Sequence, residues 1–308
     1  MGAVVSGWGI SVPDKVVTND DLSATLETSD AWIVERTGIK QRHVGGLTSA
    51  LAIDAGNKAL ADAGVQPSEV DLLILATTTP DDIVPATSAA VQDGIGLTRA
   101  GAFDLNAACS GFVYGLVAAH GLIELGIRNI LLVGSDTLSR ITDWNERTVA
   151  ILVGDGAGAC VLRSSEGPGQ LLGWDLGTDG SLRSLLYCEH GGYMIMDGKE
   201  LFRRAVRTVV DSSVAALERA GLKASDVGLF VPHQANARII QAVGQRLGIP
   251  EDRWVVTIDR YGNTSSASIP LALADALATG RLGDGSTVLL SGFGGGMTWA
   301  SAVLRWGG

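Results

Sequence analysis

The most constraining feature of this 308-residue chain is an internal repeat at about half its length. Residues 63–72 and 220–229 share one pattern: a helix that ends at glycine, a turn, an acidic residue followed by valine, and a buried strand. Two further pairs, 131–134 with 289–292 and 103–105 with 257–259, recur at a similar separation. Three matches in register indicate a duplicated unit.

The boundary between the two copies is expected near residues 164–169, a polar stretch that contains glycine and proline. This division gives an N-terminal half, 1–165, and a C-terminal half, 166–308. Within each half, β-rich apolar runs such as 72–75 alternate with Ala/Leu-rich helical stretches such as 50–63 and 206–220. Such alternation is typical of an α/β chain whose strands are covered by helices on both faces. Ligands in such folds bind at the carboxyl ends of the strands.

Composition excludes several classes of protein. The net charge of −10 argues against nucleic acid or an anionic membrane surface as partners. No apolar run reaches the roughly 18 residues of a membrane helix, and the N-terminus lacks the basic segment of a signal peptide. Three cysteines are an odd number, so a disulfide framework is not expected. Four histidines without a paired spacing predict no metal site. A cytoplasmic, reduced protein is the expectation.

Cys109 lies between a predicted strand, 102–105, and a predicted helix, 111–125. A cysteine at a helix N-terminus meets unpaired N–H groups and the positive end of the helix dipole, which predicts a lowered pKa and a nucleophilic thiolate. The alternative is an inert cysteine of the core, the commonest fate of this residue. Cys160 lies within a strand-like run and is expected in the core, whereas Cys188 lies in a loop.

Three further loops follow predicted strands. His233 comes directly after a buried strand, where a neutral imidazole can donate a hydrogen bond or act as a base; a cap or core histidine is the alternative. Asn263 lies between a predicted strand, 254–258, and a predicted helix, 269–278, and either caps the helix or offers amide donors to an oxyanion. The glycine loop around Gly295 lets backbone N–H groups approach a substrate oxygen, and it returns to a strand instead of opening a nucleotide-binding helix.

These motifs, taken in order, resemble the β-ketoacyl-[acyl-carrier-protein] synthase III family of thiolase-like condensing enzymes. The resemblance covers essentially the whole chain. Its motifs are residues 28–39, 108–112, 232–236, 262–265 and 293–296. It implies a thiolase-like fold, in which the duplicated α/β halves form a layered α-β-α-β-α sandwich.

The resemblance also implies a reaction in fatty acid biosynthesis. Cys109 takes the acyl group of an acyl-CoA primer, and His233 and Asn263 stabilise the enolate formed when malonyl-[acyl-carrier protein] loses CO2. The backbone N–H groups of Cys109 and Gly295 form the oxyanion hole. The products are a 3-ketoacyl-[acyl-carrier protein], CO2 and CoA. No metal or redox cofactor is implied, and the enzyme is expected to be a homodimer.

Other positions take roles only from the resemblance. The CoA contacts fall on Trp32, which stacks on adenine, and on Arg36, Arg147 and Asn236. Val84 stands where the family often has phenylalanine, in a loop that lines the partner subunit's acyl pocket, so a longer or wider pocket is expected. The docking surface for the acidic carrier protein is expected at three arginines, Arg203, Arg238 and Arg246. The alternative interpretation is that these residues only belong to solvent-exposed helix faces.

Two other functions stay open at this point. A priming ketosynthase or acyltransferase of a polyketide pathway shares the fold and the three reactive residues. The sequence does not separate this pathway from fatty acid synthesis, but the complete set of Cys109, His233 and Asn263 favours condensation over mere acyl transfer. Asn263 also favours a CoA-primed decarboxylating enzyme over thiolases, which use a second cysteine, and over elongating synthases, which use a second histidine. A non-catalytic acyl-binding subunit belongs to another class and predicts no acylation of Cys109.

Overall fold

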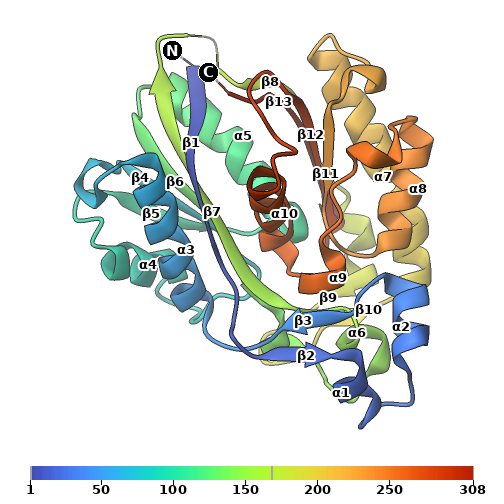
Figure 1. The fold of residues 1–308 in the computed structure, drawn as a ribbon. Coiled ribbons are helices and arrows are strands. Elements are labelled where there is room, and N and C mark those ends of the chain that lie inside the picture. Colours follow the sequence, from blue (N-terminus) through green and yellow to red (C-terminus); the bar gives the residue numbers. More distant parts are fainter. Residues whose placement is uncertain (1, 168, 308) are drawn as a thin grey trace.

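The structure, a computed structural model, describes residues 2–167 and 169–307. Its N-terminal half builds one sheet, and its C-terminal half builds another (Figure 1). The strands of the first sheet are, in spatial order, β1 (Gly2–Ser11), β7 (Asp155–Ser165), β6 (Asn129–Thr137), β4 (Leu72–Ala76) and β5 (Gly101–Leu105). Those of the second are β11 (Leu229–Pro232), β12 (Thr287–Gly294), β13 (Thr298–Arg305) and β8 (Leu171–Thr178).

The two sheets repeat one pattern of strand directions. In the first, β7 is antiparallel to β1 and β6, and β4 is parallel to both β6 and β5. In the second, β13 is antiparallel to β8 and β12, and β12 is parallel to β11. The polar stretch 164–169 falls where the chain leaves one sheet for the other.

The two halves also share a packing device. Gly9 of β1 lies so close to the next helix that a Cβ added there would overlap the carbonyl oxygen of Ala55. Gly173 of β8 meets the carbonyl of Ala216 in the same way. Glycine is therefore needed in the edge strand of each sheet where a covering helix lies directly on the backbone.

Helices form three layers around the sheets (Figure 1). Helices α3 (Thr48–Ala63) and α4 (Thr87–Ile95) pack on the outer face of the first sheet. Helices α5 (Gly111–Glu124) and α10 (Ser268–Ala278) lie between the sheets, in a core to which both halves contribute. Helices α7 (Gly198–Arg219) and α8 (Ala237–Leu247) cover the outer face of the second sheet. The expected α-β-α-β-α sandwich is confirmed.

One predicted strand is wrong. Residues 254–258 make only an isolated parallel bridge, between Trp254 and Phe230, before α9 (Ile258–Tyr261) begins. The Gln234 side chain explains the change, because its Oε1 accepts the N–H groups of Thr257 at 2.9 Å and Ile258 at 3.2 Å, which a neighbouring strand would otherwise bind. The third sequence match, 257–259, therefore does not continue the repeat.

Smaller elements lie at one end of the two sheets, around α9 (Figure 1), and several of them enclose a separate apolar cluster that includes Leu22, Ile33, Ala150 and Ile258. They are β2 (Val16–Thr18), α1 (Asn19–Ser23), α2 (Asp30–Thr37), β3 (Gln41–His43), α6 (Arg147–Ala150), β9 (Leu186–Tyr187) and β10 (Ile195–Met196). Short 3-10 turns complete the chain: η1 (Pro67–Glu69), η2 (Ala108–Ser110), η3 (Leu138–Ile141), η4 (Gly180–Leu185), η5 (Ala224–Asp226), η6 (Glu251–Arg253) and η7 (Ser265–Ala267). Within residues 2–167 and 169–307, no helix is both long and apolar enough to cross a membrane.

Candidate active site

Cys109 lies in the turn η2, between the end of β5 and the start of α5. The preceding residue, Ala108, has φ of 49°, a left-handed conformation that is uncommon outside glycine. The glycine loop holds this turn, since a Cβ at Gly294 would lie 2.5 Å from the backbone nitrogen of Cys109. The hydroxyl of Thr298 also donates to the carbonyl of Ala107 at 2.8 Å. The nucleophile's turn is thus built by both halves of the chain.

The prediction of a lowered pKa for Cys109 is wrong. Although part of the residue is accessible, burial of its thiol raises the pKa to about 12, and the charge of Asp136 acts in the same direction. The Ser265 hydroxyl and the Cys109 backbone act in the opposite direction. The prediction considered only the helix dipole, which lowers the pKa of the thiol, but desolvation of the buried thiolate raises that pKa by more. Cys160 is buried in β7, as expected, and Cys188 is exposed.

His233 follows β11 directly. Its backbone N–H donates to Ser291 at 2.8 Å, and its ring meets the Phe293 ring edge-on, with centroids 5.6 Å apart. The residue is 3% exposed, and burial lowers the pKa of the imidazole to about 3. The ring is therefore neutral at pH 7, with one N–H to donate and one nitrogen to accept.

Asn263 is held by the other half of the chain. Its backbone N–H donates to Leu152 and its carbonyl accepts from Gly154, both at 2.8 Å. Its side-chain Oδ1 accepts the backbone N–H of Ser265 at 2.9 Å. Because the oxygen is engaged, the amide presents its two N–H groups as the free function. The supporting segment 152–154, which forms an isolated parallel bridge between Val153 and Asn263 just before β7, was not foreseen from the sequence.

The segments that carry Cys109, His233 and Asn263 all lie around the carboxyl end of β12. The turn that carries Cys109 packs against β12 and against η7, which follows Asn263. Phe293, in β12, packs against His233. Gly295 follows the same strand, one residue beyond the contact with Cys109. The site therefore combines a sulfur, a neutral imidazole, an amide and a glycine backbone.

The four residues expected to contact CoA also lie together. The guanidinium of Arg147 lies over the Trp32 ring, 4.9 Å from its centroid, and that of Arg36 lies at 5.7 Å. Arg147 also donates to the carbonyl of Glu27 at 2.6 Å. Asn236 caps α8 through its Oδ1 and donates from Nδ2 to the carbonyl of Arg36 at 3.0 Å. An aromatic ring flanked by two cations is thus presented beside the start of α8.

The three arginines expected to dock the carrier protein differ in surroundings. Arg203 pairs with Glu200 at 2.7 Å, but Arg204 shares the same carboxylate at 2.7 Å, so the charge of Arg203 is only partly neutralised. Arg238 is exposed in the first turn of α8, and its guanidinium lies 5.7 Å from the centroid of the Phe202 ring. Arg246 lies in the last turn of α8, about 12 Å along the helix from Arg238. The arginines therefore do not form one compact cluster.

Val84 is 83% exposed and the neighbouring Ile83 is 79% exposed, on the loop between β4 and α4. Two adjacent apolar side chains are thus open to solvent on this loop. Among the described residues, no group of three His, Cys, Asp or Glu side chains could hold a metal ion.

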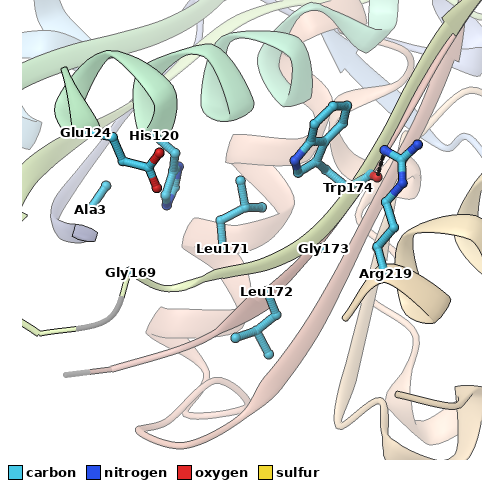
Figure 2. A pocket seen from close by; sticks show the side chains of 9 residues that line it. All are labelled: Ala3, His120, Glu124, Gly169, Leu171, Leu172, Gly173, Trp174 and Arg219. Carbon is cyan, nitrogen blue, oxygen red and sulfur yellow. Dashed lines mark hydrogen bonds between the residues drawn. The ribbon is translucent and has the colours of Figure 1, made fainter. Parts of the chain in front are cut away.

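A cavity of about 320 Å³ lies elsewhere, between the end of α5, β8 and the end of α7 (Figure 2). Arg219 donates to the carbonyl of Trp174 at 2.6 Å and stacks on its ring. On the opposite wall, His120 binds the carbonyl of Leu116 within its own helix at 2.8 Å. None of the site residues predicted from the sequence lines this cavity.

The duplicated fold, with a cysteine after β5, a histidine after β11 and an asparagine after α9, is that of a thiolase-like condensing enzyme. Residues 103–180 match the family model of 3-oxoacyl-[acyl-carrier-protein (ACP)] synthase III, and residues 217–306 match the model of its C-terminal part. The chain belongs to this family and is an acyltransferase.

Whole-length relatives agree. A β-ketoacyl-[acyl-carrier-protein] synthase III of Roseiflexus castenholzii is 49% identical over 99% of this chain and 98% of its own. The crystal structure of 3-oxoacyl-(acyl carrier protein) synthase III from Pseudomonas aeruginosa is 47% identical, covers 100% of this chain and 99% of its own, and has a TM-score of 0.96. A priming β-ketosynthase of a polyketide pathway is 36% identical, with a TM-score of 0.94, over 99% of this chain and 96% of its own.

Proposed function

We propose that this enzyme joins an acyl-CoA primer to malonyl-[acyl-carrier protein] in the initiating condensation of fatty acid synthesis, with Cys109, His233 and Asn263 as its reactive groups. The observation that carries the proposal is the convergence of a buried thiol, a neutral imidazole and an amide whose oxygen is already bound. These groups can hold an acyl chain and stabilise an enolate without any permanent charge.

The first half of the reaction is acyl transfer. The sulfur of Cys109 attacks the carbonyl carbon of acyl-CoA, and the new S–C bond forms as the bond to the CoA sulfur breaks. The proton lost by the cysteine leaves with CoA as its thiol. The backbone N–H groups of Cys109 and Gly295 would bind the oxyanion of the tetrahedral intermediate, and the tight contact at Gly294 supports this arrangement.

The second half is decarboxylation and carbon–carbon bond formation. Loss of CO2 from the malonyl group leaves its electron pair on the thioester as an enolate, whose oxygen accepts N–H groups from His233 and Asn263. The carbanion attacks the acyl–Cys109 carbonyl and expels the thiolate, which takes up a proton. A neutral imidazole suits this role because a cation would over-stabilise the ground-state carboxylate.

The CoA primer is assigned to the surface around Trp32. An aromatic face can stack on adenine, while the guanidinium groups of Arg36 and Arg147 attract phosphates. The carrier protein would dock beside this entrance, with Arg238 as the principal contact, because it carries an exposed charge next to the CoA residues at the start of α8. Arg246 and the partly neutralised Arg203 would add weaker attraction from a distance.

A homodimer is part of the proposal. Strand β5 is at the edge of its sheet, and Phe103 on it is 38% exposed, so another copy could cover it. The exposed loop with Ile83 and Val84 precedes α4 on the same side of the sheet. In a dimer this loop would reach the partner's acyl pocket, where Val84 would admit longer or branched primers. The cytoplasm is the proposed location.

The priming ketosynthase of a polyketide pathway is the less favoured function. The polyketide relative is 36% identical to this chain, whereas the synthases III of Pseudomonas aeruginosa and Roseiflexus castenholzii named above are 47% and 49% identical.

Intact-protein mass spectrometry after incubation with acyl-CoA tests the proposal. The wild-type enzyme should gain one acyl group, and Cys109→Ala should gain none. Cys188→Ala is the matched control, because Cys188 is exposed and should not affect acylation. Absence of acylation in the wild-type enzyme would favour the non-catalytic acyl-binding subunit instead.

A further inference from the structure

We propose that Ser265 is a fourth member of the reactive site, and that its hydroxyl donates a hydrogen bond to the sulfur of Cys109 from a turn that Asp136 holds in place. The inference rests on the proposed role of Cys109 as the nucleophile, and it gives a role to Ser265, which lies in the motif 262–265 but to which the sequence analysis assigned none. Four observations carry it: the position of Ser265, the state of its hydroxyl, its backbone conformation and the anchoring of its turn.

The position of Ser265 ties it to two of the three reactive residues. Its backbone N–H donates to Oδ1 of Asn263 at 2.9 Å and so orients that amide. Its turn, η7, packs directly against η2, the turn that carries Cys109. Ser265 therefore lies between the nucleophile and the amide that would bind the enolate.

The hydroxyl of Ser265 is enclosed. The residue is 1% exposed, and among residues 2–167 and 169–307 its Oγ has no hydrogen-bond partner. Buried hydroxyl groups are normally hydrogen-bonded, because an unsatisfied one costs free energy. The hydroxyl is therefore free to donate to the thiol of Cys109 in the adjacent turn, where Ser265 acts against the rise in pKa that burial causes.

The backbone of Ser265 is in the left-handed region, with φ of 51°. A residue with a side chain rarely adopts this conformation, and it persists where the surrounding structure enforces it. Glycine would remove the strain but also the hydroxyl. The presence of serine at a position that suits glycine indicates that the hydroxyl itself is used.

Asp136 anchors the turn. Its Oδ2 accepts the backbone N–H of Ser266 at 2.9 Å and the Ser266 hydroxyl at 2.6 Å. Its Oδ1 accepts the N–H groups of Thr78 at 2.6 Å and Thr79 at 3.1 Å, in the loop after β4. One fully buried carboxylate therefore fixes the position of Ser265 against the N-terminal half.

A hydroxyl donor from Ser265 would offset the effect of burial on the Cys109 thiolate. Burial opposes the thiolate of Cys109, and the carboxylate that anchors the turn opposes it further. A hydroxyl donor stabilises the thiolate more than the thiol, because a hydrogen bond to a charged acceptor is stronger. The donor would act twice in each cycle, when Cys109 attacks the primer and when the acyl group departs to the carbanion. It transfers no proton itself.

The test is the rate at which iodoacetamide alkylates Cys109, followed by peptide mass spectrometry between pH 6.5 and 10. The thiolate displaces iodide, so the rate follows the thiolate population and needs neither acyl-CoA nor carrier protein. In Ser265→Ala, which keeps the turn but loses the hydroxyl, the rate at pH 8 should fall about tenfold, the effect of losing one hydrogen bond to a charged group. Ser265→Gly should show the same fall.

Ser88→Ala is the matched control. Ser88 is also fully buried, and its Oγ also forms no hydrogen bond within the described residues, but it lies in α4, away from Cys109. This variant should keep the wild-type profile. A wild-type profile in Ser265→Ala would overturn the proposal. If that variant does not fold, Ser265→Gly decides the question, because glycine accommodates φ of 51° without strain. If the proposed function itself were wrong, the separate experiment with acyl-CoA would show no acylation of the wild-type enzyme.

Discussion

At the scale of single residues, burial determines the protonation state of the reactive groups. It raises the pKa of Cys109 and lowers that of His233, so both groups are neutral at pH 7. Charge then develops only during the reaction, on the sulfur and on the enolate oxygen, where fixed donors meet it. Cys109, His233 and Asn263 could be identified from their motifs, but their protonation could not, because a sequence does not show how deeply a side chain is buried.

The depressed pKa of His233 makes stability depend on pH. Between pH 6.5, the ordinary value for the unfolded chain, and about 3, the unfolded state binds a proton that the folded state does not. Stability therefore falls as pH decreases through this range. Between pH 7 and pH 5, His233→Gln should lose about 2 kcal/mol less of its unfolding free energy than the wild type, measured by urea denaturation at each pH.

The control for this experiment is His190→Gln, since His190 is exposed in a loop. That variant should follow the wild-type dependence on pH. The same slope in His233→Gln and in the wild type would show that the buried imidazole is not the source of the acid sensitivity.

At the scale of elements, the turn with Cys109 and the glycine loop work as one unit. The sequence predicted the helix after Cys109 and the strand after the loop, which the structure has as α5 and β13. It could not predict the contact between the turn and the loop, because the only sign of such a close backbone approach in the sequence is the presence of glycines. The wrong strand at 254–258 has a similar cause, since one side chain, Gln234, binds the N–H groups of that segment.

Gly294→Ala tests the contact between turn and loop. The added Cβ would lie 2.5 Å from the Cys109 nitrogen, so one of the two oxyanion donors must move. We expect kcat/KM for condensation to fall at least about 100-fold, the effect of losing one such donor. Gly283→Ala, with open space around the new methyl group, should keep wild-type kinetics. Equal activity in the two variants would contradict the assignment of the oxyanion hole.

Helix α8 gives a second prediction at this scale. Arg238→Glu reverses an exposed charge in its first turn, so KM for the acidic carrier protein should rise about tenfold while KM for acyl-CoA changes little. Arg128→Glu, an exposed residue just before β6 at the other end of the sheet, is the control. Steady-state kinetics at low salt would measure both constants. A parallel rise in both constants for Arg238→Glu would place that residue outside the docking surface.

At the scale of the whole molecule, the duplication explains why one site needs both halves. Each half supplies a sheet of the same strand order, and the two sheets enclose α5 and α10 in one core. The repeat, the layers and the alternation of strand and helix were predictable from sequence. The supports of Asn263 and the Asp136 anchor were not, because they join residues more than 100 positions apart.

The proposed dimer gives a prediction for Val84. A phenylalanine at this exposed position would shorten the partner's acyl pocket, so Val84→Phe should shift kcat/KM towards shorter primers in a panel of acyl-CoA substrates. Leu125→Phe is the control, because Leu125 is 85% exposed at the end of α5, on another surface. Chain-length kinetics unchanged from the wild type would remove Val84 from the pocket.

The central claim, that Cys109 holds the acyl group while Asn263 serves the decarboxylation, is tested most directly by Asn263→Asp. Aspartate keeps the shape of the side chain but replaces the amide donors with a negative charge that opposes the enolate. Mass spectrometry should show Cys109 acylated as in the wild type, while release of CO2 from malonyl-[acyl-carrier protein] falls at least about 100-fold. Condensation at the wild-type rate in this variant would contradict the account.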